Sequence, residues 1–208
     1  MKIAVIGGTG KIGGAVAKHL AKSNSVIIGS RDPVKAEGAA KKIDGAVGAD
    51  YATAAREAEA AVVAVPYSAL ATLSVLADKL SGKLVISTVN PLKFENGLTL
   101  FALERGSAAE ELAELLPKSR VATGFNNVPP LLLQRDEVVP MDVMVAADTR
   151  ETYDEAAKII GSIPNIRPLY AGPLSQAGLI EALTAVVLNL ASLNKTGSLT
   201  TRFASRRE

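Results

Sequence analysis

MKIAVIGGTGKIG, residues 1–13, is a short apolar run followed by a cluster of glycines. Gly8, Gly10 and Gly13 satisfy the pattern G-x-G-x-x-G, and the amphipathic segment KIGGAVAKHLAKS overlaps its end. This order predicts a strand, a tight turn and the N-terminus of a helix, which together can bind the pyrophosphate of a dinucleotide. The N–H groups and positive dipole of the helix end attract phosphate, and glycine lets it approach the backbone. The alternative is a glycine-rich turn without a ligand.

The second predicted strand, residues 25–29, ends in residues that favour NADP over NAD. An NAD-binding protein usually has an acidic residue here, which binds the ribose 2′-hydroxyl. This chain has Ser30 and Arg31 instead, and Lys35 lies in the first turn of the next helix. A hydroxyl, a guanidinium and an ammonium together can hold a 2′-phosphate. Three alternatives stay open: Arg31 could stack on the adenine, Asp32 could bind a hydroxyl, and the two cations could simply be solvated.

Composition restricts the other classes of function. The chain has 208 residues, of which 48% are hydrophobic, enough for one domain with a sizeable core and a small appendage. A net charge of +2 gives no basis for a nucleic-acid surface, and we expect the arginines Arg202, Arg206 and Arg207 to form a solvated tail. The absence of cysteine excludes disulfides and thiol catalysis. We expect no signal peptide, no membrane-spanning apolar run and no membrane partner, and hence a cytoplasmic protein.

The rest of the chain alternates between predicted strands and helices. The strands are expected at 60–65, 83–87, 120–123, 142–147 and 166–169, and the helices at 68–79, 107–116 and 149–160. This alternation predicts an α/β fold with a Rossmann-type doubly wound parallel sheet, which the last of these strands closes. Ligands bind such sheets at the carboxyl ends of the strands. The turns at 65–67, 88–91 and 125–127 are therefore expected to line the site, although each could be an ordinary turn.

The C-terminal segment 174–193 predicts one long helix that is apolar around most of its circumference. Such a helix needs burial on more than one side. Against one sheet it would expose a large apolar patch, which favours a homodimer interface over burial within one chain. We therefore divide the chain into a dinucleotide-binding domain, residues 1–170, and a C-terminal helical segment, residues 171–208.

Acid–base machinery is hard to find in this sequence. The one histidine, His19, falls within the first predicted helix, where we expect it on the surface or in helix packing. Tyr153 and Lys158 are five residues apart and do not form a Tyr-x-x-x-Lys pair, and no cluster has metal-ligand spacing, so no metal site is predicted. Hydride transfer between two redox cofactors needs only two rings held face to face. The sequence suits that simpler reaction.

Motifs near both ends of the chain share one resemblance. They are residues 7–10, 29–31, Lys35, residues 171–175, Leu183, Thr184 and Asn189. Together they resemble the archaeal and bacterial NADPH:coenzyme F420 oxidoreductases, which are related to the cytoplasmic domain of a ferric-reductase family. The resemblance covers essentially the whole chain. It implies a Rossmann domain with a small C-terminal helical part, usually a homodimer, and hydride transfer between NADP(H) and the deazaflavin coenzyme F420.

The resemblance also implies site residues by position. At NADP(H) these are Gly8, Thr9, Gly10, Lys11 and Ile12 for the pyrophosphate, Ser30, Arg31 and Lys35 for the 2′-phosphate, and Val65, Asn90 and Pro130 for the nicotinamide. For catalysis it implies Thr184, near the deazaflavin, and Asn126, at the position of a histidine in the family's deazaflavin pocket. The C-terminal segment would complete the site of this second cofactor.

Three positions depart from the family pattern, all on the side of the second cofactor. Asn126 stands in place of the histidine, and Gly178 and Ala182 stand in place of an arginine and a serine on the last helix. A lost arginine is a lost clamp for an anion. The acceptor is therefore open between coenzyme F420, a flavin and a ferric chelate. A non-enzymatic NADP-binding redox sensor is a further alternative.

Overall fold

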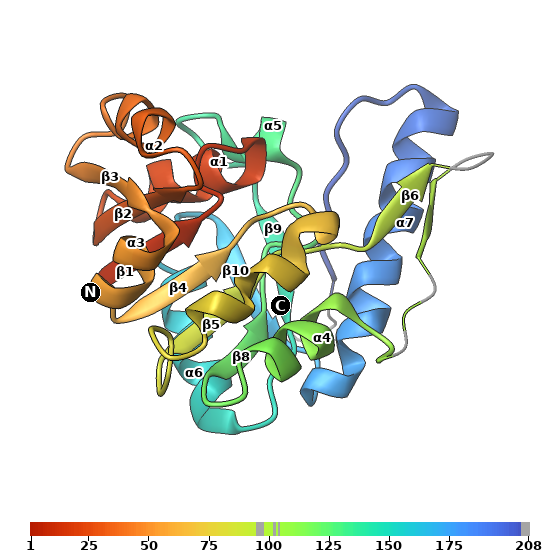
Figure 1. Ribbon diagram of the computed structural model, residues 1–208. Coiled ribbons are helices and arrows are strands. Elements are labelled where there is room, and N and C mark those ends of the chain that lie inside the picture. The colour runs from red at the N-terminus through yellow and green to blue at the C-terminus, as the bar shows by residue number, and fades with distance from the viewer. Residues whose placement is uncertain (95–97, 102, 104, 205–208) are drawn as a thin grey trace.

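The centre of the fold is a six-stranded parallel sheet with the strand order β3-β2-β1-β4-β5-β8 (Figure 1). The computed structural model describes residues 1–94, 98–101, 103 and 105–204. The strands of the sheet are β1 (Lys2–Ile6), β2 (Ser25–Ser30), β3 (Ala46–Asp50), β4 (Ala60–Val63), β5 (Leu84–Ser87) and β8 (Arg120–Thr123). The strand order reverses between β1 and β4, where sheets of this kind bind dinucleotides. The doubly wound parallel sheet predicted from the sequence is confirmed.

Helices cover both faces of this sheet, because successive side chains of each strand point to opposite sides. In β1, Ile3 and Val5 pack into one apolar cluster, whereas Ala4 and Ile6 pack into the other. The first cluster lies under α1 (Lys11–Leu20), α2 (Pro33–Ala40) and α6 (Arg150–Ile160), and the second under α3 (Tyr51–Glu57), the 3₁₀ helix η1 (Tyr67–Leu76) and α4 (Ala108–Leu115). Burial on both faces explains why the central strands are continuous apolar runs.

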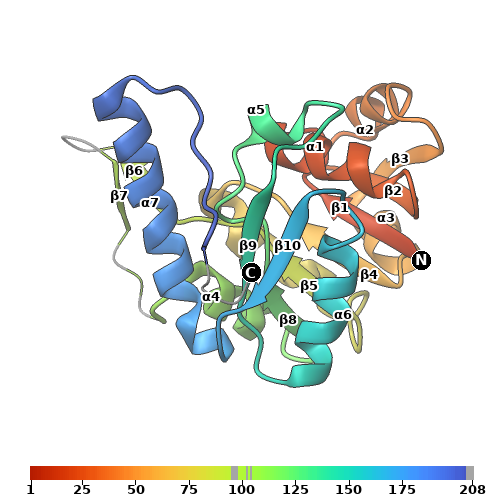
Figure 2. The same ribbon diagram turned by 180° about the vertical axis from the view of Figure 1, so that it is seen from behind.

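The two strands after β8 form a sheet of their own, which corrects the prediction that residues 166–169 close the main sheet. β9 (Met141–Val145) and β10 (Ile166–Tyr170) pair in parallel with each other beside α6 (Figure 2). An antiparallel bridge between Ala122 and Ala147 links this pair to β8. Because the chain approaches β8 in the opposite direction there, it cannot extend the parallel ladder.

Three parts of the fold were not predicted, one of which is the short helix α5 (Pro130–Leu133). β3 and α3 are alanine-rich and only partly buried, so they lack the apolar runs that mark the other elements. β6 (Leu92–Phe94) and β7 (Leu98–Leu100) form an antiparallel hairpin. This hairpin lies beside the last helix in Figures 1 and 2.

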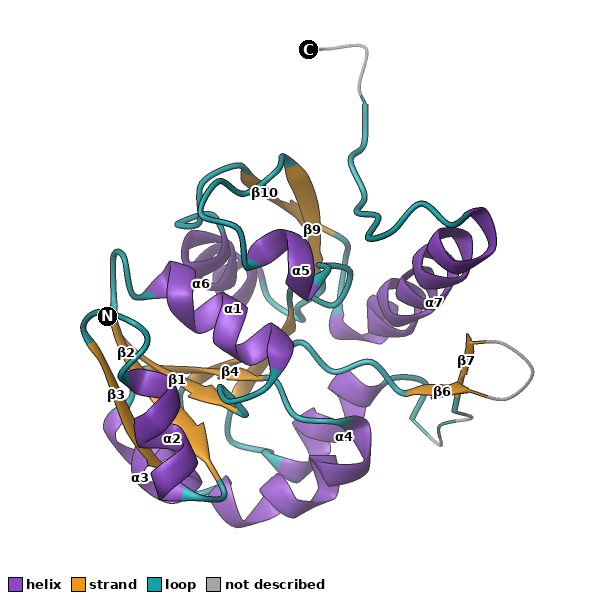
Figure 3. Ribbon diagram, turned by 90° about the horizontal axis from the view of Figure 1, so that it is seen from above, coloured by secondary structure: helices purple, strands orange, loops and turns teal. Residues whose placement is uncertain are grey.

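The last helix stands beside the main sheet rather than on it (Figure 3). A 3₁₀ turn, η2 (Leu174–Gln176), leads into α7 (Ala177–Asn194), which packs on α4 and on the hairpin. The Asn189 side chain accepts a hydrogen bond from the N–H of Leu98 at 3.3 Å and donates one to its carbonyl at 2.9 Å. By length and composition, Leu174–Asn194 could also span a membrane, with a mean hydropathy of 1.5. The expectation that no apolar run reaches that length is therefore wrong, although buried core helices meet the same criterion.

The segment after α7 turns back toward β9. Arg202 is exposed, as expected for a solvated tail, but neighbouring residues are hydrogen-bonded to the body of the protein. Arg206 and Arg207 lie outside the described residues. The expectation of a solvated side chain therefore holds for Arg202, while the backbone next to it is bound to β9.

Candidate functional site

The turn between β1 and α1 presents an open helix N-terminus. Gly7 has φ of 87°, and the N–H groups of Gly7 and Gly8 donate to the carbonyl of Gly29 at 3.1 and 3.2 Å, which ties the turn to the end of β2. Gly10 is the N-cap, and the first turn of α1 contains no acidic residue. A Cβ on Gly13 would lie 2.5 Å from the Gly7 carbonyl oxygen, so only glycine lets the helix approach this closely. The backbone N–H groups and helix dipole can therefore face an anion.

The predicted 2′-phosphate ligands lie at the carboxyl end of β2, next to this turn. The Ser30 hydroxyl is buried and accepts from the N–H of Asp32 at 3.2 Å. Asp32 caps α2, because its Oδ1 accepts from the N–H groups of Val34 and Lys35 at 3.0 and 3.3 Å. Its carboxylate is thus engaged by the helix, which weakens the alternative of a hydroxyl ligand. Arg31 is exposed and makes no hydrogen bond or ion pair with the described residues.

A cavity of about 290 Å³ runs along α1 from the glycine turn. Four predicted pyrophosphate residues line it, namely Gly8, Thr9, Gly10 and Lys11. Ser30, Arg31 and Lys35 lie outside its described lining. The structure therefore places the predicted pyrophosphate and 2′-phosphate ligands at neighbouring positions, but not in one cavity.

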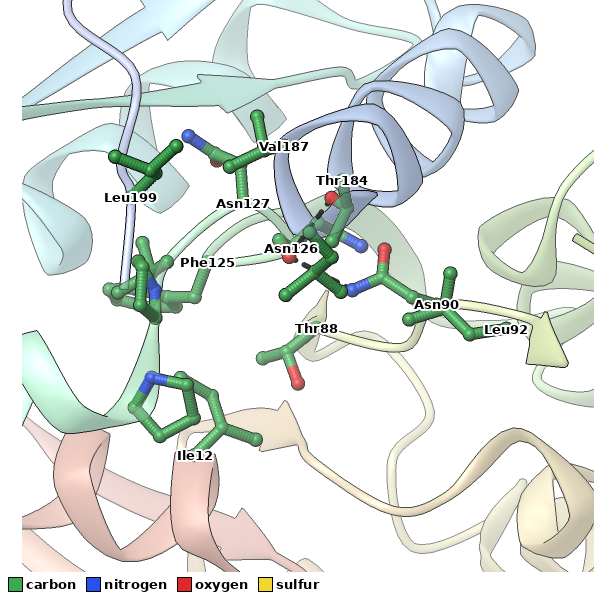
Figure 4. Close-up of a pocket in the computed structure, with 14 residues that line it drawn as sticks. Ile12, Thr88, Asn90, Leu92, Phe125, Asn126, Asn127, Thr184, Val187 and Leu199 are labelled. Carbon is green, nitrogen blue, oxygen red and sulfur yellow. Dashed lines mark hydrogen bonds between the residues drawn. The ribbon is translucent and has the colours of Figure 1, made fainter. Parts of the chain in front are cut away.

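A second cavity, of about 170 Å³, lies at the carboxyl ends of the strands (Figure 4). We call it the site cavity. Its lining consists of Ile12, Thr88, Asn90, Leu92, residues 125–130, Thr184, Val187, Leu188 and Leu199. Five predicted site residues thus meet here, namely Ile12, Asn90, Asn126, Pro130 and Thr184. Val65 lies outside the described lining and is buried against Gly7.

Asn126 is bound to the protein on both sides of its amide. Its Oδ1 accepts from the N–H of Gly124 at 3.1 Å, and its Nδ2 donates to the carbonyl of Val89 at 3.0 Å. Its own carbonyl accepts from Asn90 Nδ2 at 2.9 Å and from Thr184 Oγ1 at 3.1 Å. Asn126 therefore joins the loops after β5 and β8 to α7. This geometry fits a residue that positions the wall of the cavity.

Two buried oxygens in this wall, Asn90 Oδ1 and Asn127 Oδ1, have no hydrogen-bond partner among the described residues. The orientation of each amide is set by its Nδ2, which donates to the carbonyl of Asn126 and to that of Asp142 respectively. An unpaired buried acceptor costs about 1–3 kcal/mol. A ligand with N–H groups would satisfy these oxygens, as the carboxamide of a nicotinamide or the pyrimidine ring of a deazaflavin can. The residues present therefore fit both cofactors.

Phe125 is a wall residue with a strained backbone. It is buried and has φ of 63°, in the left-handed region that bulky residues rarely adopt. Such strain persists only where the surrounding structure enforces it, and it is frequent at functional sites. Phe125 belongs to the turn 125–127, which was expected to line the site, whereas Leu199 was not predicted. The only sequence signal of Leu199 is an apolar residue in a polar segment.

The buried carboxylate of Glu181 anchors α7, which carries Thr184. Its Oε2 and Oε1 accept from the N–H groups of Ala108 and Ala109 at 3.0 and 3.2 Å, at the start of α4. Burial raises the pKa of Glu181 to about 7, against the opposing effect of these two hydrogen bonds. One turn earlier, a Cβ on Gly178 would lie 2.7 Å from the carbonyl oxygen of Gly106. This contact leaves no room for the arginine that the resemblance implies at position 178.

Glu181→Gln is expected to flatten the pH dependence of stability between pH 4.5 and about 7. Because the pKa is higher in the folded state, the folded protein binds more protons in this window, and its free energy of unfolding falls as the pH rises. Across this window, Glu181 lowers the free energy of unfolding of the wild type by about 3 kcal/mol at most. Urea unfolding at pH 5 and pH 8 measures it, with the exposed Glu151→Gln as control. Equal pH dependence in the wild type and Glu181→Gln would contradict this assignment.

His19 has a structural position away from the site cavity. It is buried, and its Nε2 donates to the carbonyl of Leu133 at 2.7 Å, while burial lowers its pKa. The expectation that it takes part in helix packing is confirmed. In the part of the chain that the structure describes, no group of three or more His, Asp or Glu side chains could hold a metal ion.

Comparison with known proteins extends the similarity over the whole chain. Residues 2–91 match the family model described as NADP oxidoreductase, coenzyme F420-dependent. The chain is 38% identical over 211 residues to the F420-dependent NADP reductase of Methanothermobacter marburgensis, covering 94% of each chain. It is 34% identical over 205 residues to that of Methanocaldococcus jannaschii, covering 91% of this chain and 92% of the relative. A crystal structure described as an F420-dependent NADP reductase of an Arthrobacter species aligns with a TM-score of 0.86 and 26% identity, over 99% of this chain and 100% of that one.

Proposed function

This chain belongs to the family of coenzyme F420-dependent NADP oxidoreductases, and we propose that its reaction takes place in the site cavity. The chain is an NADP-dependent oxidoreductase that transfers a hydride between NADP(H) and coenzyme F420. The observation that carries the location is the meeting of Ile12, from the helix after the glycine turn, with Thr184 of α7 across one cavity (Figure 4). Residues 1–170 would bind NADP(H), and residues 171–208 would complete the site of the second cofactor.

Each predicted site residue has a place in this proposal. Gly8, Thr9, Gly10, Lys11 and Ile12 bind the pyrophosphate, Ser30, Arg31 and Lys35 bind the 2′-phosphate, and Val65, Asn90 and Pro130 surround the nicotinamide. The support is that the first two groups lie around an open helix N-terminus and the adjoining end of β2. Asn90 also offers an unpaired oxygen to a carboxamide.

Asn126 and Thr184 position the two rings. The bound nicotinamide and deazaflavin supply the redox chemistry themselves, one giving and the other accepting a hydride. The protein must hold them face to face and exclude water. The hydrogen bond from Thr184 to Asn126 fixes α7 relative to the strand ends, and the lining, which includes Phe125 and Val187, is mostly apolar and disfavours water. Reduction of the deazaflavin by NADPH also takes up one proton, and because the described lining contains no ionisable side chain, this proton would come from solvent.

Anaerobic oxidation of NADPH by the purified protein tests the acceptor. Coenzyme F420, FMN, FAD and a ferric chelate are compared at equal concentrations. We expect fast turnover with F420 alone, which would mean that Gly178 and Ala182 are tolerated. Turnover with a flavin or with iron would identify a changed second site. NADPH binding without turnover by any acceptor would indicate a redox sensor.

We further propose a homodimer in the cytoplasm, with α7 at its interface. Four exposed apolar residues form one stripe along this helix, namely Leu179, Val186, Leu190 and Leu193. Their spacing of seven, four and three residues places them on one face. The polar groups of Glu181 and Thr184, on the same helix, already have hydrogen-bond partners within the chain. An exposed apolar stripe of this kind is typical of a protein interface.

Val186→Lys combined with Leu190→Lys is expected to convert the dimer into a monomer, because two desolvated charges would replace apolar contacts at the interface. Sedimentation velocity measures the mass in solution. The control combines Val34→Lys with Val75→Lys, which replace valines with exposed fractions of 76% and 73% elsewhere on the surface. A wild-type protein that sediments as a monomer would refute the interface.

A further inference from the structure

The chain after α7 returns across the molecule and is bound to β9 (Figure 2). Lys195 ends α7 in the left-handed conformation, with φ of 53°. Further along, the N–H of Asp142 donates to the carbonyl of Thr201 at 2.9 Å. Asn127 Nδ2 donates to the hydroxyl of the same threonine at 2.7 Å. The segment therefore has a defined path over β9.

A partly buried ion pair, in which the Arg167 side chain is 40% exposed, holds this segment in place. Asp142 on β9 is 1% exposed and pairs with Arg167 on β10. Arg167 Nε donates to Asp142 Oδ1 at 2.7 Å, and Arg167 Nη2 donates to Asp142 Oδ2 at 3.0 Å. The Asp142 carboxylate also accepts the N–H of Phe203, and the Arg167 guanidinium donates to the carbonyl of Phe203 at 2.6 Å. We call these three residues the tail latch. Both peptide groups of Phe203 are thus bound by the pair.

The tail latch is connected to the site cavity in two ways. Leu199, four residues before Phe203, lines the cavity beside Val187 and across from Ile12 (Figure 4). Asn127, another lining residue, donates both to Thr201 and to the carbonyl of Asp142, each at 2.7 Å. The position of this wall therefore depends on the latch. Asp142 and Arg167 themselves lie outside the described lining of the cavity.

We propose that Asp142 and Arg167 are positioning residues of the hydride transfer, which hold Leu199 against the second cofactor and so set the affinity for its ring system. This inference rests on the proposed location of the reaction in the site cavity. Leu199 lies on the α7 side, whereas the glycine turn lies on the other side, beyond Ile12. Loss of the latch therefore weakens the binding of coenzyme F420 and leaves the binding of NADPH unchanged.

Asp142→Asn tests the proposal, because it keeps the shape of the side chain but removes its charge and one acceptor. We expect the KM for F420 to rise at least about tenfold, equivalent to about 1.4 kcal/mol, with the KM for NADPH unchanged within about twofold. The matched control is Glu155→Gln, which breaks the ion pair between Glu155 on α6 and Arg120 on β8, neither of which belongs to the described lining of the site cavity or contacts Phe203 through a hydrogen bond. The control should leave both KM values unchanged.

Trypsin cleavage after the exposed Arg202, followed by mass spectrometry, gives a second readout. Cleavage should be slow in the wild type, slower still with F420 bound, and fast in Asp142→Asn. Leu199→Ala should raise the KM for F420 without faster cleavage, and it keeps the test decisive if Asp142→Asn does not fold. An unchanged KM for F420 in folded Asp142→Asn, or equal rises for F420 and NADPH, would overturn the proposal. A wild type without F420 turnover would instead refute the proposed function.

Discussion

Arg31→Ala is expected to raise the KM for NADPH about 100-fold and to leave the KM for NADH within about twofold of the wild-type value. Arg31 is exposed beside the glycine turn and makes no hydrogen bond or ion pair with the described residues, so its guanidinium is available to a ligand. A hydrogen bond to a charged group contributes about 1.5–3 kcal/mol, and a guanidinium can make two to one phosphate. NADH has no 2′-phosphate and loses neither.

Steady-state oxidation of both nucleotides by F420 measures this change in specificity. Arg56→Ala, which removes an exposed arginine at the end of α3, is the matched control and should change neither KM. An equal rise in the KM for NADPH and for NADH in Arg31→Ala would mean that the residue stacks on the adenine or stabilises the fold. It would contradict the binding of the 2′-phosphate at this end of β2.

Gly13→Ala is expected to lower the free energy of unfolding and to weaken the binding of NADPH strongly. The new Cβ would lie 2.5 Å from the carbonyl oxygen of Gly7 and 2.9 Å from the Cα of Gly8. Both neighbours are backbone atoms, so the turn itself must move. Overpacking of this kind costs about 1–3 kcal/mol, and the displaced turn no longer presents its N–H groups to the pyrophosphate. We expect the KM for NADPH to rise more than about 100-fold, equivalent to about 2.8 kcal/mol.

Gly38→Ala is the matched control, since it makes the same substitution within α2. Among the described residues, nothing lies within 4 Å of the Cβ it would add. Alanine is favoured over glycine in a helix interior by about 0.5–1 kcal/mol, so this control should be slightly more stable than the wild type. Urea unfolding and NADPH kinetics on both variants give the comparison. Wild-type kinetics in Gly13→Ala would show that the turn does not bind the pyrophosphate.

Local signals made the first half of the fold predictable. The glycine turn and the end of β2 are each encoded within a few consecutive residues, and the central strands are apolar on both faces. β3 lacked such a signal, because its residues, Ala46–Asp50, are small and only partly buried. The direction in which the chain meets β8 is a property of the assembled protein, so alternation alone could not predict that β9 and β10 pair separately.

The site was predictable as a set of residues but not as a set of contacts. Ile12, Asn90, Asn126, Pro130 and Thr184 were expected and line one cavity. The Asn126 amide donates to the carbonyl of Val89, which is 37 positions away in the sequence. Such a contact depends on the assembled fold and is not visible in the local sequence. The pairing of Asp142 with Arg167, separated by 25 positions, likewise depends on the register of β9 and β10.

The walls of the site cavity come from both ends of the polypeptide. Ile12 belongs to the first helix, and Leu199 lies close to the C-terminus. Almost two hundred residues separate these two walls in the sequence, so the cavity exists only in the folded chain. Removal of residues 195–204 would take away Leu199 and leave the glycine turn and Ile12 in place.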